Sequence, residues 1–120
     1  MTRLNKDYWS PATPRVARDA LPWVSSGVLT ASAVAKNKPG LLGGIIVTAT
    51  DAAGTVDVIV WDSPDSTLTG DERLCRITIP ELTAKTWKEF HAPSGCGIQA
   101  EKGLYVQVVA GACEVIVYYK

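Results

Sequence analysis

The stretch of residues 41–62 constrains the fold of this chain more than any other, because it holds two apolar, β-branched runs separated by a short turn. The runs are residues 45–50 and 55–61, and residues 51–54 (Asp-Ala-Ala-Gly) lie between them. Asp at the start of a turn and Gly at its left-handed position are typical of a tight connection. The pattern predicts two neighbouring antiparallel strands joined as a hairpin.

The second of these runs is apolar on nearly both of its faces. Strand alternation places three valines on one face and Asp57, Ile59 and Trp61 on the other, so that only Asp57 is expected to face water. A strand of this kind is typical of the middle of a sheet that a second layer covers. Trp61 is accordingly expected to belong to the core.

Length and charge exclude several classes of protein. A chain of 120 residues is enough for one domain that buries roughly two-thirds of its unfolded surface. Twelve Lys plus Arg balance twelve Asp plus Glu, and no basic stripe accompanies the aromatic residues, so little would attract nucleic acid. The apolar runs are shorter than the roughly 18 to 20 residues that cross a bilayer, and the N-terminal segment lacks a signal peptide's apolar stretch. We expect a soluble domain with neither nucleic acid nor membrane among its partners.

Turn residues recur about every ten positions from Gly27 onward, and the segments between them have strand character. These segments are residues 27–36, 45–50, 55–61, 73–79, 86–92, 97–100, 104–110 and 113–119. The last two are expected to form a second hairpin, and the Gly43-Gly44 pair is expected to mark a bulge or a close backbone approach.

This spacing predicts an all-β fold, a sandwich or a barrel. A single jelly-roll-like β-sandwich of about eight strands over residues 27–120 fits best, with residues 62–72 and 83–85 crossing between the sheets. An immunoglobulin-like sandwich is the alternative, and Trp61 and Cys113 do not have that family's spacing.

Residues 1–26 are interpreted as an extended N-terminal arm. The arm combines three prolines with Tyr8, Trp9 and Trp23 and shows no sustained strand or helix period. Burying three large aromatic side chains contributes about 12 to 15 kcal/mol, whereas ordering some 25 backbone residues costs at least about 25 kcal/mol. Because disordered tails are usually poor in aromatics, we expect an arm that docks in extended form on a partner surface.

The arm also carries four basic and two acidic residues, a positive excess that suits an acidic partner surface. An alternative is that Leu21, Trp23 and Val24 lie on their own domain as an edge strand while residues 1–20 extend. For Trp23 this alternative is favoured. The candidate partner-binding residues of the arm are Tyr8, Trp9, Arg15, Arg18 and Trp23.

Three cysteines, Cys75, Cys96 and Cys113, have no CxxC spacing. Small buried or half-buried residues in a reducing compartment are favoured over a disulfide or a metal site. Cys96, between two glycines in a loop, is expected to be the most reactive of the three.

The sequence contains no recognisable catalytic device. His91 is the sole histidine, no Gly-x-Ser-x-Gly motif is present, and His91 is expected at the surface near a sheet edge. The acids Asp62, Asp65, Asp71 and Glu72 with nearby hydroxyls are a conceivable Ca²⁺ site, but their spacing favours a solvated loop. We therefore expect no enzyme, no cofactor and no metal.

Two tryptophans, Trp61 and Trp87, raise the possibility of stacking on sugar rings, although such residues more often belong to a core or an interface. Trp87, Phe90, Tyr118 and Tyr119 place more large apolar side chains at outward positions than one core needs. Self-association through these four residues is therefore expected.

The run GLLGGIIVTATDAAGTVDVIVWDSPDSTLTGDERL, the later Gly-Leu-Tyr-Val-Gln-Val-Val-Ala-Gly and the closing Val-Ile-Val-Tyr-Tyr resemble the small β-rich structural proteins of tailed bacteriophages. The resemblance covers roughly residues 27–120 and is to capsid decoration, or cement, proteins with a jelly-roll domain and an extended arm. It implies a virion protein, made in the host cytoplasm, that binds the major capsid protein and stabilises the capsid surface. It further implies a trimer whose arms reach across neighbouring subunits.

Non-enzymatic capsid decoration is thus the expected function. A carbohydrate-binding β-sandwich that uses Trp61 or Trp87 is the first alternative, and a head-to-tail or tail component is the second.

Overall fold

The computed structural model describes residues 23–50, 54–80, 86–92 and 97–120. The candidate arm residues Tyr8, Trp9, Arg15 and Arg18 lie outside these ranges, as does Cys96. Within them the regular structure is entirely β. The strands are β1 (Val24–Ser25), β2 (Ala33–Lys36), β3 (Gly40–Ala49), β4 (Val56–Asp62), β5 (Glu72–Ile79), β6 (Trp87–His91), β7 (Ile98–Ala100), β8 (Leu104–Ala110) and β9 (Cys113–Tyr119).

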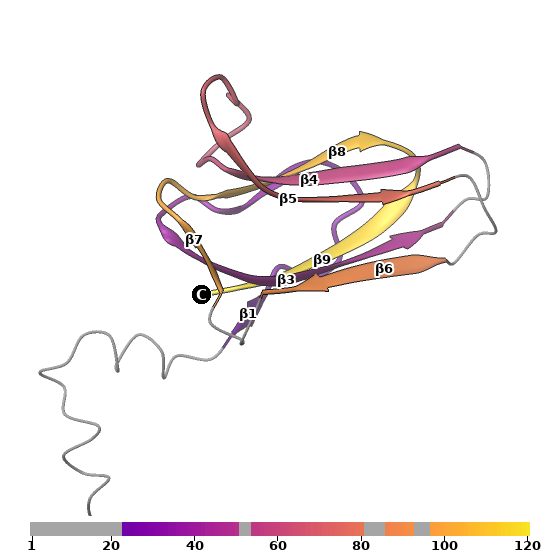
Figure 1. Ribbon diagram of the computed structural model, residues 1–120, viewed down its shortest axis with the longest axis horizontal. Coiled ribbons are helices and arrows are strands. Elements are labelled where there is room, and N and C mark those ends of the chain that lie inside the picture. The colour runs from indigo at the N-terminus through magenta and orange to yellow at the C-terminus, as the bar shows by residue number, and fades with distance from the viewer. Residues whose placement is uncertain (1–22, 51–53, 81–85, 93–96) are drawn as a thin grey trace, which may run out of the picture.

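The strands form two antiparallel sheets that pack face to face (Figure 1). Sheet A has the order β1-β9-β3-β6, with β7 also paired to β3, and sheet B has the order β2-β8-β4-β5. The pairs are nested along the chain: β1 with β9, β2 with β8, β3 with β6 and β7, and β4 with β5. Nested pairing distributed over two sheets is the jelly-roll arrangement, so the predicted fold class is confirmed.

Both predicted hairpins are wrong. β3 belongs to sheet A and β4 to sheet B, while β8 belongs to sheet B and β9 to sheet A. Their long partners come from the other half of the chain, since β3 pairs with β9 and β4 pairs with β8. Turn residues specify that the chain reverses, but they do not specify whether the next strand pairs in the same sheet or packs in the other one. In the structure the next strand lies in the opposite sheet, and this arrangement buries the inner faces of both strands, which pairing within one flat sheet would not do.

The predicted sheet crossings are half right. Residues 62–72 do not cross, because they join β4 and β5, which are paired within sheet B. β5 and β6 do lie in different sheets, although residues 83–85 themselves are outside the described ranges.

The predicted strand over residues 27–36 is divided in the structure. Leu29 forms an isolated bridge with Val115 of sheet A, whereas β2 pairs with β8 of sheet B. The chain passes from one sheet to the other within this segment, so a single continuous strand is not possible.

The core lies between the two sheets and is almost wholly aliphatic. Its buried members are Leu42, Ile45, Val47, Ala49, Val56, Val58, Val60, Ile77, Ile79, Ala100, Leu104, Val106, Cys113, Val115 and Val117. The three valines of β4 face this core, as strand alternation predicts. The opposite, outward side of each sheet is therefore free to carry other chemistry.

Candidate functional site: the outer face of sheet A

Strands β6, β3 and β9 of sheet A each direct every second side chain away from the core. Because Ile45 and Val47 point into the core, the alternate residues Ile46 and Thr48 point outward. The pairing register aligns the outward residues of β6, β3 and β9 in three rows: Trp87, Thr48 and Glu114; Glu89, Ile46 and Ile116; and His91, Gly44 and Tyr118. These nine residues, together with Trp23, which directly precedes β1, are called the outer face of sheet A.

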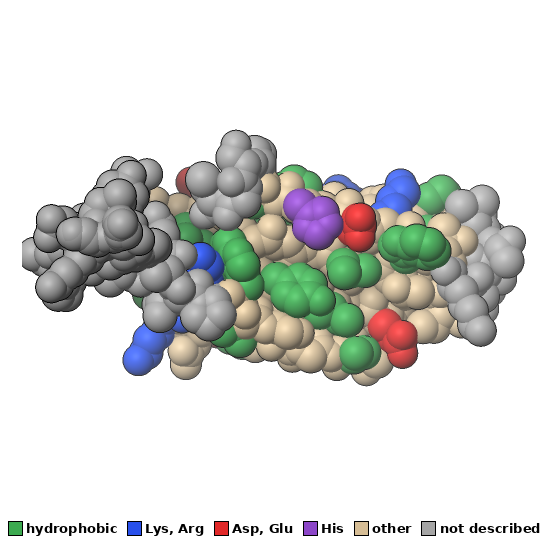
Figure 2. Space-filling model, turned by 90° about the horizontal axis from the view of Figure 1, so that it is seen from below, with side chains coloured by type: hydrophobic (Ala, Val, Ile, Leu, Met, Phe, Trp, Pro, Cys, Tyr) green, Lys and Arg blue, Asp and Glu red, His purple; other side chains and the backbone are tan. Residues whose placement is uncertain are grey.

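This face is rich in apolar side chains. Trp87 is 63% exposed and Trp23 is 36% exposed, while Ile46, Ile116 and Tyr118 are half-buried. Figure 2 shows hydrophobic side chains extending across the face, with the histidine and acidic groups beside them. Large apolar side chains gathered on one exposed face are typical of an interaction surface.

A hollow of about 310 Å³ lies at one end of the face, lined by Trp23, Gly43, Gly44, His91, Ala92 and Tyr118. The pairing of β3 with β9 shifts register between Leu42 and Gly44, so the predicted bulge at the glycine pair is confirmed. Since neither glycine has a side chain, the Trp23 ring packs against Gly43 and the His91 imidazole against Gly44. The rings of Trp23 and Tyr118 and the imidazole of His91 form its sides.

Trp23 packs on its own domain, as the edge-strand alternative predicts. A Cβ atom added to Gly43 would lie 2.7 Å from the Trp23 ring, so the indole rests directly on this glycine. The Lys120 ammonium lies 4.4 Å from the centroid of the same ring, a cation–π distance. β1 follows at once and pairs with β9. Trp23 is therefore held on the sandwich and forms part of the face.

The four aromatic residues predicted to form an oligomer interface do not lie on one surface. Trp87 and Tyr118 lie on the outer face of sheet A, whereas Phe90 and Tyr119 pack against the core. Strand alternation explains the division, because Phe90 is paired with inward-pointing Ile45. Ile46 and Ile116 were missed, although alternation along residues 113–119 could have identified Ile116.

The outer face of sheet B differs, because its polar groups bind one another. The Asp57 carboxylate accepts hydrogen bonds from Arg76 Nε at 3.0 Å, Arg76 Nη2 at 2.6 Å and Thr78 Oγ1 at 3.2 Å. Hydrogen bonding to the Arg76 guanidinium lowers the pKa of Asp57, and burial partly opposes the shift. Asp57 is 8% exposed, so the prediction that it faces water is wrong, since Arg76 and Thr78 on β5 satisfy and cover it.

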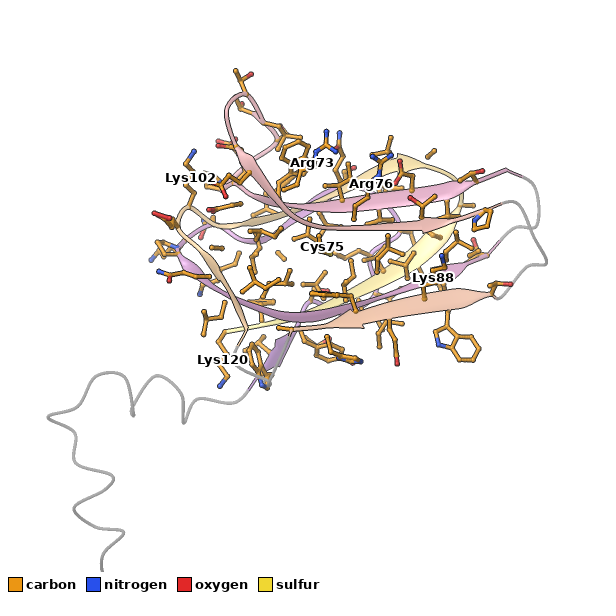
Figure 3. All side chains as sticks on the ribbon, in the orientation of Figure 1. Arg73, Cys75, Arg76, Lys88, Lys102 and Lys120 are labelled. Carbon is orange, nitrogen blue, oxygen red and sulfur yellow. The ribbon has the colours of Figure 1, made fainter. Side chains whose placement is uncertain are left out.

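Trp61 is half-buried on this outer face and does not belong to the core, contrary to the prediction. Its Nε1 donates to Gln107 Oε1 at 2.9 Å, and the Arg73 guanidinium lies 5.4 Å from its ring centroid. In Figure 3, Arg73 and Arg76 lie on the outer side of sheet B. The Trp61 ring is thus already engaged by neighbours on β5 and β8.

The acids around the β4–β5 loop are structural. The Asp62 carboxylate accepts hydrogen bonds from the backbone N–H groups of Glu101, Lys102 and Gly103 at 3.0, 2.8 and 3.4 Å. Lys102 Nζ lies 2.6 Å from Asp71 Oδ1, and this bond lowers the pKa of Asp71. The prediction of a solvated loop is wrong for Asp62 and Asp71. Backbone N–H groups of residues 101–103 bind the Asp62 carboxylate, and the Lys102 ammonium binds the Asp71 carboxylate.

The remaining candidate residues lie as expected where the structure describes them. Cys75 is half-buried and Cys113 is buried, both as free thiols, and burial raises the pKa of Cys75 to about 11. His91 is exposed on edge strand β6, with its Nε2 atom 3.6 Å from Glu89 Oε1. Among the described residues no group of three or more His, Cys, Asp or Glu side chains is placed to hold a metal ion.

Comparison with protein-family models, with curated proteins and with solved structures gives no match for this chain. Across the described ranges, no helix has the length and apolar character needed to span a membrane. Among the described residues, the outer face of sheet A, with the hollow beside Trp23 and Tyr118, is the arrangement best suited to binding another molecule.

Proposed function

We propose that this protein is a non-enzymatic structural protein of a tailed-phage virion that binds and stabilises the capsid surface, as decoration proteins do. The observation that carries the proposal is the apolar outer face of sheet A, which joins the exposed Trp87 to the half-buried Ile46, Ile116 and Tyr118. The sequence resemblance supplies the class of partner, the major capsid protein.

The chemistry of this face favours a protein partner over a sugar. A sugar ring carries several hydroxyl groups, and each must find a polar partner when it leaves water. The side chains that line the hollow offer three polar groups for this purpose, the His91 imidazole, the Tyr118 hydroxyl and the Trp23 indole N–H. Trp61, one of the two tryptophans proposed for sugar stacking, is held by Gln107 and Arg73. Apolar protein side chains make no such demand, and their burial at about 25 cal/mol per Å² favours binding.

The proposal is tested by measuring how much of the protein binds to purified phage heads that lack it, which is called occupancy below. Replacing Trp87 and Ile116 together by serine removes apolar contact area from the outer face of sheet A, and we expect occupancy at fixed protein concentration to fall at least about tenfold. The matched control replaces Val34 and Val109, which are exposed on sheet B, by serine and should bind as the unaltered chain does.

Equal occupancy of both double variants would assign binding to another surface. Retention of the unaltered chain on a glycan array, lost in Trp87→Ala, would instead favour the carbohydrate-binding alternative. Thermal melts of each variant distinguish loss of binding from loss of fold.

A further inference from the structure

One row of side chains crosses all four strands on the outer face of sheet B. Arg73 on β5 is paired with Trp61 on β4, Trp61 with Tyr105 on β8, and Tyr105 with Val34 on β2. At ~4.8 Å between neighbouring strands, this sheet B row is about 14 Å long. Tyr105 is half-buried and Val34 is 43% exposed. Trp, Tyr and Arg are the residue types most enriched where a protein surface contributes most to binding a partner.

The polar groups in and beside this row are held in place by their neighbours. Trp61 Nε1 donates to Gln107 Oε1 at 2.9 Å, and this bond orients the Gln107 amide so that its Nε2 group remains as a donor. The Arg73 guanidinium lies over the Trp61 ring, and Arg76 is bound through Nε and Nη2 to Asp57. Because these side chains are ordered before a partner arrives, binding costs less conformational entropy.

The hydrogen-bonding groups that this face leaves unused are mainly donors. Within the described part of the chain, no carboxylate lies within ion-pair distance of Arg73, and neither Gln107 Nε2 nor the Tyr105 hydroxyl has a hydrogen-bond partner. The Asp57 carboxylate already accepts three hydrogen bonds. Two guanidinium groups against this one carboxylate leave the face with a positive charge. A complementary partner must supply acceptors, and carboxylates suit Arg best because they bind its guanidinium in a bidentate manner.

We propose that the outer face of sheet B binds an acidic segment of a second protein. A carboxylate side chain of that segment binds Arg73 and Gln107, and an apolar side chain packs on Tyr105 and Val34. The inference goes beyond the proposed function, because the sheet B row lies on the opposite side of the sandwich from the outer face of sheet A (Figure 1).

An acidic protein segment fits this face better than two other acidic molecules. One positive charge is too few for nucleic acid, whose affinity depends on the neutralisation of many phosphates. A base or a sugar ring would stack on an open aromatic face, and the Arg73 guanidinium lies over the ring of Trp61.

An NMR titration of the isotope-labelled full chain tests the site, because the side-chain N–H groups of Arg73, Trp61 and Gln107 give separate signals. The probe is a copolymer of glutamate and tyrosine, and a copolymer of lysine and tyrosine is the control for charge. We expect the three signals to shift with the acidic copolymer and not with the basic one. Alginate, an acidic polysaccharide, and single-stranded DNA are titrated in parallel. Shifts with either of these as large as with the acidic copolymer, or no shift of the three signals with that copolymer, would overturn the proposal.

Substitution of Arg73 tests the same contact by a second route, with the dissociation constant of the acidic copolymer as the measurement. Arg73→Gln should weaken binding at least about tenfold, because it removes the charge that no carboxylate of the described residues satisfies. Arg73→Lys keeps the charge but loses the bidentate geometry, so most of the same loss is expected. Lys38→Gln removes one charge from an exposed turn outside the row and is the matched control. Full affinity in Arg73→Lys, or an equal loss in Lys38→Gln, would show attraction by charge alone and contradict the proposed site.

Discussion

The two sheets of this sandwich share one core, but their outer faces differ. On sheet B, Asp57 binds Arg76 and Thr78, and Trp61 binds Gln107 beneath Arg73. On sheet A, Trp87 is 63% exposed, and a hollow lies beside Trp23 and Tyr118. Around Asp57 and Trp61 the first face is completed by side chains of the chain itself, although Val34 and Val109 on the same sheet are exposed, whereas Trp87 on the second face remains mostly exposed.

The comparison teaches that alternation along a strand does not distinguish a stabilising outer face from a binding one. Ile59 on sheet B is 5% exposed although it points away from the core, because Arg76 and Gln107 flank it in the ladder. Ile46 on sheet A has Glu89 and Ile116 in the corresponding positions and remains half-buried. The difference lies in the length and charge of cross-strand neighbours.

The largest expected effect is on sheet B, from Trp61→Ala. Loss of the ring contacts and of the bond to Gln107 should cost about 2 to 3 kcal/mol of unfolding free energy, less than for a fully buried tryptophan. Denaturant titration measures the loss. Trp61→Phe, which keeps a ring but lacks the N–H donor, should lose about 1 kcal/mol. An unchanged midpoint for Trp61→Ala would show that the face of sheet B is not self-stabilised.

A smaller effect is expected from Asp57. Asp57→Ala should lower the free energy of unfolding by about 1 to 2 kcal/mol, since the carboxylate is buried but the Arg76 side chain remains half exposed to water.

Asp57 also predicts a dependence of stability on pH. Because its pKa is lowered in the folded protein, its contribution is fully present above the unfolded value near pH 4 and is lost as the pH falls through the folded value. Asp57→Asn should therefore flatten the decline of the melting temperature below about pH 4. An equally steep acid decline in this variant would assign the effect to other carboxylates, of which Asp71 has a pKa shifted in the same direction.

The smallest effect on stability is expected on sheet A, from Trp87→Ser. The side chain is mostly in water, so unfolding free energy should change by no more than about 0.5 kcal/mol. The same variant should nevertheless weaken binding to a partner, because an exposed aromatic group contributes most when it becomes buried. A loss of stability comparable to that of Trp61→Ala would remove the distinction between the two faces.

Much of the local structure follows from the sequence. The pattern of residues 104–110 and 113–119 predicts the bounds of β8 and β9 as observed, and Gly43-Gly44 marks the bulge. Trp23 and Val24 lie on their own domain as the edge-strand alternative states. The strand bounds and the bulge depend on residues that are close in sequence, through period-two alternation and the missing side chain of glycine.

The partners of each strand and the chemistry of each outer face depend on the tertiary structure. Asp57 meets Arg76 nineteen positions away, and Trp61 meets Gln107 forty-six positions away. The hollow joins Trp23, Gly44 and Tyr118 from three separate strands or their ends. Period-two alternation determines which side chains of a strand point away from the core, but it does not determine which other strand pairs with that strand. Pairing is decided by the burial of whole sheets against each other, and only that packing gave Asp57 and Trp61 partners from the chain itself while it left Trp87 exposed.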